Sequence, residues 1–167
     1  IGTSFFGGSN VNVTRVGCVG VDVSDGSIVI GSVVTEISKE AFANCTNLVL
    51  VSIEADSQLQ MINDDAFIKS SLTNILIPES VTLIGYSAFA YCDNLYRIVF
   101  DPNPYLSIQN TTFDASNEFD LVMNYSDWVN WQNKPVISSY TNIDFFGGSN
   151  INIILSNAPE PTSSPTL

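Results

Sequence analysis

The sequence of 167 residues contains no histidine. Histidine supplies the general base of Ser-His and Cys-His catalysis, and it is the commonest protein ligand for zinc. The sequence also lacks a phosphate-binding loop and a dinucleotide-binding fingerprint. Its nearest approach to a calcium loop, Asp22-x-x-Asp25-Gly26, lacks the further ligands that such a loop supplies, so we interpret it as a turn. We therefore expect no catalytic residues, no metal site and no cofactor.

Positive charge is also scarce. Five Lys and Arg residues stand against 17 Asp and Glu residues, which gives a net charge of -12. No basic stripe is available to neutralise phosphates or anionic lipid headgroups. No run of apolar residues approaches the roughly 20 that a membrane-spanning helix needs. We therefore expect neither a nucleic-acid partner nor insertion into a membrane.

The sequence does contain a repeated unit of about 24 residues, which occurs four times. It reads Ile-x-x-x-Ala/Thr-Phe-x-x-Cys/Ser and continues as Leu-x-x-Ile-x-Ile or a variant of it. The isoleucine and the phenylalanine are five residues apart in every copy, at Ile37 and Phe42, Ile62 and Phe67, Ile84 and Phe89, and Ile108 and Phe113. Such a repeat predicts a solenoid, in which each unit stacks on its neighbours and has no core of its own.

Each unit predicts one rung of that solenoid. The last two apolar residues of the unit are two apart, so they share the inward face of a short strand. Strands stacked at one per rung form a parallel sheet, and the Ala-Phe segment supplies a short helical or 3-10 turn whose phenylalanines line up in the core. Because a partial unit stands on either side of the four copies, we expect a mainly β, right-handed solenoid of about six rungs.

The residues that point outward from these strands form two expected columns. One column is Leu50, Asn74, Arg97 and Leu121, and the other is Ser52, Leu76, Val99 and Met123. Five of the eight are apolar, and a contiguous exposed apolar patch marks an interface. Either this face binds a ligand, or a terminal segment covers it and makes it ordinary core. The interface candidates are Leu50, Leu76, Arg97, Val99, Leu121 and Met123.

The three cysteines leave at least one thiol unpaired within the chain. Cys45 and Cys92 hold the same repeat position two rungs apart, which predicts a separation of roughly 10 Å, beyond the approximately 7 Å limit for a disulfide. We expect both to be buried small hydrophobes, as Ser70 and Ser116 hold the same position in the other copies. Cys18 lies outside the register, and we expect it to be free or bridged to another chain.

A longer repeat encloses the shorter one. The segment Phe-Phe-Gly-Gly-Ser-Asn followed by Val-Asn-Val at 5–13 returns at 145–153, with Ile-Asn-Ile in the last three places. One explanation is that the second copy begins the next unit of a tandem array. The alternative is that the two copies cap opposite ends of one solenoid, because a solenoid needs caps to cover its end rungs. Phe5, Phe6, Phe145 and Phe146 are the candidates for contacts in an assembly.

The chain therefore divides into four expected segments. These are an N-terminal strand or cap at 1–25, the solenoid at 26–137, a C-terminal strand, cap or start of the next unit at 138–157, and a Pro/Ser/Thr-rich linker at 158–167 that cannot order itself. The sequence begins at Ile1 without a leader, so we expect a removed signal sequence or a longer parent protein. N-glycosylation sequons stand at Asn12, Asn44, Asn110 and Asn124.

Two stretches of the repeat resemble a known family. Residues 80–95 read Ser-Val-Thr-Leu-Ile-Gly-Tyr-Ser-Ala-Phe-Ala-Tyr-Cys-Asp-Asn-Leu, and residues 34–37 and 41–48 read Val-Thr-Glu-Ile and Ala-Phe-Ala-Asn-Cys-Thr-Asn-Leu. Both resemble the repeat of BspA-like leucine-rich repeat proteins. The resemblance covers about residues 26–131. It implies a curved leucine-rich solenoid on surface proteins of bacteria and protists, with roles in adhesion and in host or matrix binding, and no catalytic residues.

Two hypotheses for the function follow. The first is a non-catalytic extracellular or cell-surface module that binds a protein or glycan ligand. The second is a structural building block of an extracellular filament or coat, whose neighbouring copies assemble head to tail because a heterologous contact propagates. The first predicts a monomer with an open apolar face, and the second predicts oligomers that depend on concentration.

Overall fold

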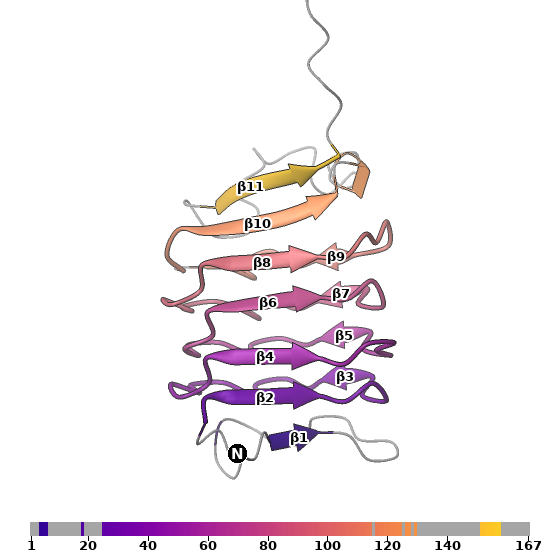
Figure 1. Ribbon diagram of the computed structural model, residues 1–167. Coiled ribbons are helices and arrows are strands. Elements are labelled where there is room, and N and C mark those ends of the chain that lie inside the picture. The colour runs from indigo at the N-terminus through magenta and orange to yellow at the C-terminus, as the bar shows by residue number, and fades with distance from the viewer. Residues whose placement is uncertain are drawn as a thin grey trace, which may run out of the picture.

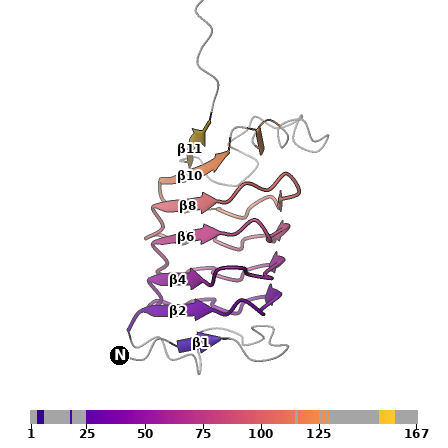
Figure 2. The ribbon, with the colours of Figure 1, turned by 45° about the vertical axis from the view of Figure 1, so that its right-hand side comes forward.

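The computed structural model describes residues 4–6, 18, 25–114, 116–124, 126, 127, 129 and 151–157, with the backbone alone for residues 4–6. These residues form a parallel β-solenoid, as expected (Figure 1). Each of its four complete turns contributes one strand to a long sheet and one to a short sheet. Figure 2 shows the long strands and the short strands on separate sides of each turn.

All the strand pairs in both sheets are parallel. The long sheet has seven strands, in the order β1 (Ser4–Phe6), β2 (Ser27–Ile30), β4 (Leu50–Ile53), β6 (Asn74–Ile77), β8 (Arg97–Phe100), β10 (Phe119–Asn124) and β11 (Ile151–Ser156). The short sheet has four two-residue strands, in the order β3 (Glu36–Ile37), β5 (Met61–Ile62), β7 (Leu83–Ile84) and β9 (Ser107–Ile108).

The core lies between the two sheets. Alternate residues of the long strands point inward, as Ile75 and Ile77 do in β6, and the second residue of each short strand closes the core from the other side. Those second residues are the isoleucines of the repeat, and all four are buried: Ile37, Ile62, Ile84 and Ile108. Stacking in register therefore turns one repeated apolar pattern into continuous buried rows.

The repeated phenylalanines form the expected column. Phe42 and Phe67 stack with their ring centroids 5.1 Å apart, Phe67 and Phe89 at 5.3 Å, and Phe89 and Phe113 at 5.9 Å. All four side chains are fully buried. The prediction of an aromatic spine through the core is confirmed.

The Ala-Phe segments are isolated hydrogen-bonded turns. In the first, Ala43 N donates to Glu40 O. The N–H groups of Phe42, Phe67 and Phe89 each donate to a carbonyl of the next rung, as Phe67 N does to Ala88 O at 2.8 Å. The residues two before and two after the phenylalanine adopt left-handed backbone, for example Ser87 (φ 53°) and Tyr91 (φ 56°). None of these positions is a glycine, so a strained backbone is held here by rung-to-rung hydrogen bonds.

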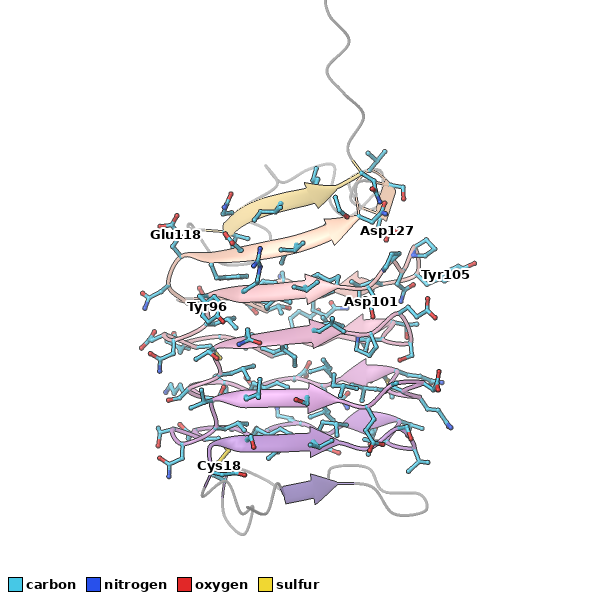
Figure 3. All side chains as sticks on the ribbon, in the orientation of Figure 1. Cys18, Tyr96, Asp101, Tyr105, Glu118 and Asp127 are labelled. Atoms are coloured by element: carbon cyan, nitrogen blue, oxygen red, sulfur yellow. A yellow bond between two sulfur atoms is a disulfide. The ribbon has the colours of Figure 1, made fainter. Side chains whose placement is uncertain are left out.

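The expectation for two of the cysteines was wrong. Cys18 and Cys45 form a disulfide within the chain, with their Cα atoms 5.0 Å apart (Figure 3). Cys18 is thus neither free nor bridged to another chain, and Cys45 is not a plain buried hydrophobe. The expectation that Cys45 does not pair with Cys92 is confirmed, and Cys92 is a free, buried thiol.

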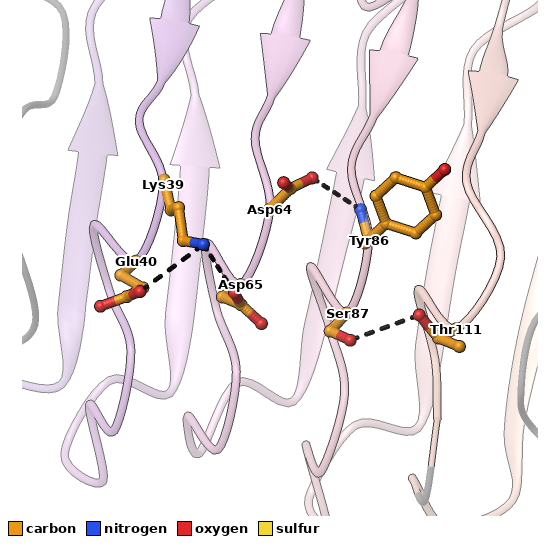
Figure 4. A network of polar contacts seen from close by, with 7 residues as sticks. All are labelled: Lys39, Glu40, Asp64, Asp65, Tyr86, Ser87 and Thr111. Carbon is orange, nitrogen blue, oxygen red and sulfur yellow. Dashed lines mark hydrogen bonds and ion pairs between the residues drawn. The ribbon is translucent and has the colours of Figure 1, made fainter.

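Polar side chains link neighbouring rungs on the turn side of the solenoid (Figure 4). Lys39 Nζ lies 3.6 Å from Asp65 Oδ2 on the next rung, and Ser87 Oγ lies 3.4 Å from Thr111 Oγ1. Asp64 Oδ1 accepts a hydrogen bond from Tyr86 N at 2.9 Å. The carboxylates of Asp64 and Asp65 therefore each contact a neighbouring rung.

Gly85 is required by the last of these contacts. A Cβ atom at this position would lie 2.5 Å from both the backbone N and the Oδ1 of Asp64, and the clash with backbone cannot be relieved by a rotamer change. We expect Gly85→Ala to lower the free energy of unfolding by about 2 kcal/mol. Urea unfolding followed by circular dichroism measures this loss. The control is Ser52→Ala at an exposed position, where we expect a change within about 0.5 kcal/mol. Equal stability of the two variants would contradict the tight packing at Gly85.

Candidate functional site

The outer face of the long sheet carries two rows of side chains. The first row, fixed by strand register, is Ser27, Leu50, Asn74, Arg97, Asp120 and Asn152. Arg97 lies 3.9 Å from the carboxylate of Asp120, and Asn152 Nδ2 donates to the same carboxylate at 2.9 Å. Both members of the ion pair are well exposed, so the pair contributes little to stability. The row is mainly polar, with Leu50 as an exposed exception.

The second row is largely apolar, and we name it the outer stripe. Its residues are Val29, Ser52, Leu76, Val99, Val122 and Ile154, one from each strand of the long sheet except β1. Leu76, near the middle of the outer stripe, is 50% exposed, and the other apolar residues of the stripe are partly exposed. Among the described residues, no segment buries this row. From Leu76 to Ile154 the row is apolar without interruption, and an apolar row on an open face is typical of an interaction surface.

The sequence placed the last rung in the wrong register. Leu121 and Met123 were expected to point outward, but both are buried in the core with Phe119. The partner of Arg97 in β10 is Asp120, and the partner of Val99 is Val122. A slip of one residue exchanges the two faces of a strand, so the outward residues of β10 are its even-numbered ones.

The other predicted site residues are distributed as follows. Leu50, Leu76 and Arg97 are exposed on the outer face and Val99 is partly exposed, as expected. Among the sequons, Asn44 and Asn110 are exposed, while Asn124 is partly buried and accepts hydrogen bonds from Ser126. Asn12, Phe145 and Phe146 lie outside the described residues. Phe5 and Phe6 belong to β1, of which only the backbone is described.

A groove of about 670 Å³ lies beside the outer stripe, at the carboxyl ends of β4, β6 and β8. We name it the acidic groove. Four carboxylates and a set of apolar side chains line it: Glu54, Asp56, Glu79 and Asp101 with Ile53, Leu76, Pro78 and Pro102. Sequence reasoning missed it, although an acidic residue follows each of these strands within two positions.

The thiol of Cys92 is buried and hydrogen-bonded. Its Sγ donates to Phe67 O at 3.1 Å and lies 3.5 Å from Ser70 Oγ. Burial raises the pKa of the Cys92 thiol to about 11, and the hydrogen bonds with Ser70 offset this only in part. Because the thiolate is the reactive form, the thiol is unreactive at neutral pH.

This raised pKa gives a prediction for stability. The pKa of the thiol has its ordinary value of 9.0 in the unfolded chain and rises to about 11 in the folded chain. Because the unfolded chain ionises first as the pH rises, the free energy of unfolding is highest below pH 9 and falls as the pH rises to 11. We expect the wild type to lose about 2 kcal/mol more than Cys92→Ser between pH 9 and 11. Urea unfolding of the two proteins at both pH values measures the difference. Parallel curves would show that Cys92 ionises equally in both states.

Neither a metal site nor a membrane-spanning helix is found in the part of the chain that the structure describes. No three His, Cys, Asp or Glu side chains gather there closely enough to hold an ion. No helix among these residues has the length and hydropathy that a membrane span requires.

Two solved structures resemble this chain. The crystal structure of the pneumococcal vaccine antigen PcpA is 30% identical, with a TM-score of 0.56, over 59% of this chain and 25% of that one. A leucine-rich repeat protein from Bacteroides ovatus is 26% identical, with a TM-score of 0.44, over 69% of this chain and 34% of that one. The chain thus matches a minor part of the length of each. No curated protein matches it.

The repeat itself matches a family description. Residues 24–126 match the BspA type leucine-rich repeat region, with six copies of the repeat. This range covers the four complete turns and the β10 strand, and it includes every residue of the phenylalanine column. The match spans well over half of the chain, as the resemblance of the two most regular units led us to expect. The chain belongs to the family of BspA-type leucine-rich repeat proteins.

Proposed function

We propose that this chain is a non-catalytic module of an extracellular or cell-surface protein, and that its outer stripe binds a protein partner. The observation that carries the proposal is the stripe itself, an apolar row of which Leu76 is half exposed. Burial of such a row against a partner is favourable at about 25 cal/mol per Å². Adhesion to a host or matrix protein is the use that fits a surface module of this kind.

Two further observations support the location. The disulfide between Cys18 and Cys45 is typical of proteins that fold in an oxidising compartment. One of the similar solved structures is a pneumococcal vaccine antigen, and a surface location of this chain is in keeping with that similarity. The exposed sequons at Asn44 and Asn110 are compatible with glycosylation in a secretory pathway.

Binding to immobilised extracellular-matrix proteins tests the proposal. We expect at least one of them to bind the wild type, and Val99→Asp to weaken that binding about tenfold or more, because it buries a charge in the interface centre. The matched control is Val33→Asp, which makes the same change at a 43% exposed position in the loop after β2. Equal weakening by both variants, or binding to free glycans in place of proteins, would contradict the proposal.

A second candidate is assembly of copies end to end. It is favoured by the position of β1 and β11 at opposite ends of the seven-stranded sheet, where each pairs with one strand among the described residues (Figure 1). Under this alternative, 138–157 acts as the start of a further unit, and Phe5, Phe6, Phe145 and Phe146 are the candidates for contacts in the assembly. Light scattering over a dilution series separates the two candidates. A monomer at every concentration counts against assembly, and a series of oligomers counts against a simple binding module.

A further inference from the structure

We propose that the acidic groove holds an extended peptide segment in which basic and aliphatic side chains alternate. The proposal rests on the proposed function, because it names the chemistry of the segment that a protein partner would present. The groove continues the outer stripe, since Leu76 belongs to both. A partner that covers the stripe therefore reaches the groove at the carboxyl ends of the same strands.

The walls of the groove fit such a segment. Its apolar side chains come from Ile53, Leu76, Pro78 and Pro102, and they offer contact to aliphatic side chains. The carboxylates of Glu54, Glu79 and Asp101 come from three successive rungs, so negative charge runs along the solenoid rather than converging on a point. Figure 3 shows Asp101 at the carboxyl end of β8. A row of carboxylates beside an apolar wall is better suited to bind an extended peptide than to bind a single cation.

No basic side chain neutralises these carboxylates among the described residues. The three cations described are engaged elsewhere: Lys39 with Glu40 and Asp65, Lys69 over the ring of Tyr91, and Arg97 with Asp120. A complementary charge must therefore come from a partner, and charge complementarity of this kind raises association rates and selects partners. A shared metal ion is a poor match, because no metal-binding group of three occurs in the described part of the chain.

One carboxylate of the groove is held in place by a hydrogen bond from the neighbouring rung. Glu54 Oε2 accepts a hydrogen bond from Ser32 N at 2.8 Å, which fixes the position of this carboxylate on the groove wall. A carboxylate that is already ordered loses less conformational freedom when a partner binds to it.

The test uses the full chain and a fluorescent, end-blocked heptapeptide of alternating lysine and leucine. Fluorescence anisotropy at low and at physiological salt gives its dissociation constant. We expect the double variant Glu79→Gln and Asp101→Asn to weaken binding about fivefold at low salt, and less at physiological salt. The matched control is Asp93→Asn with Glu118→Gln, which removes the same charge at exposed positions away from the groove. We expect the control to change binding less than twofold.

Two further peptides decide between this proposal and diffuse attraction to an acidic protein. A peptide of alternating lysine and serine keeps the charge and lacks the apolar side chains, and we expect it to bind about fivefold more weakly than the lysine-leucine peptide. Equal binding of the two peptides, equal weakening by the groove and control variants, or no binding would each overturn the proposal. If Val99→Asp abolishes binding to a matrix protein while the groove variant retains it fully, the groove proposal fails and the proposed function stands.

Discussion

Replacing Phe67 by alanine is expected to lower the free energy of unfolding by about 3–5 kcal/mol. The ring is fully buried and lies between two others, 5.1 Å from the Phe42 centroid and 5.3 Å from the Phe89 centroid. Its removal leaves a cavity between rungs whose spacing is fixed by their own hydrogen bonds. Collapse cannot fill the space, because each rung is fixed to the next at both sheets.

Urea unfolding of Phe67→Ala and the wild type, followed by circular dichroism, measures this effect. The control is Tyr105→Ala, which truncates an aromatic side chain that is 79% exposed and should change stability by less than about 0.5 kcal/mol. Because each rung of a solenoid stabilises its neighbours, the loss at Phe67 should appear in the whole transition rather than in a minor phase. A loss below about 1 kcal/mol would mean that the phenylalanine column is not packed as described.

Loss of the disulfide is the second large effect. Cys18→Ser removes a disulfide between residues that are 27 positions apart in the sequence. Without this bridge the unfolded chain gains conformational entropy, which lowers the free energy of unfolding by about 3.5 kcal/mol. Cys45, one of the two bridged residues, is buried in the first complete turn. Loss of the disulfide therefore destabilises the N-terminal end of the solenoid.

The measurement is thermal unfolding with and without a reducing agent. We expect the reducing agent to lower the melting temperature of the wild type to that of Cys18→Ser, and to leave the variant unchanged. The free thiol of Cys92 is present in both proteins and serves as an internal control. Equal stability of oxidised wild type and variant would contradict a structural role for the bridge.

Much of the fold was predictable because stacked units repeat their sequence at a fixed spacing. The constant interval from Ile37 to Phe42 and in the other copies fixed the register, and the stacked rings confirm it. The outward positions of Leu76 and Val99 followed from the alternation of side chains along a strand. These predictions held because every rung of that region obeys one pattern.

The prediction failed where the pattern changes. In β10, we expected Leu121 and Met123 to point outward, at the positions that Arg97 and Val99 hold in β8. The strand is six residues long and alternates strictly, with Phe119, Leu121 and Met123 buried and the residues between them partly exposed. The polar residues Asp120 and Asn124 lie on the same face of such a strand, which leaves Phe119, Leu121 and Met123 for the inward face, and this was the sequence feature that could have corrected the register.

The disulfide and the acidic groove could not be predicted for different reasons. Cys18 lies outside the repeat, and the pairing of cysteines does not follow from a sequence alone. The groove depends on loops of unequal composition that follow three strands, so its carboxylates come together only once the rungs are stacked. Features that every repeat shares were visible in the sequence, whereas a bridge from outside the repeat and a groove lined by the variable loops were not.

The orientation of the side chains in β10 and β8 defines the outer stripe, and labelling of single cysteines tests it most directly. Val99→Cys and Val122→Cys are expected to react rapidly with a maleimide in the folded protein, while Leu121→Cys and Met123→Cys react at the slow rate of the wild type, whose Cys92 is buried. Rapid reaction at Leu121 and Met123 together with protection at Val122 would place the apolar row inside the core and contradict the account.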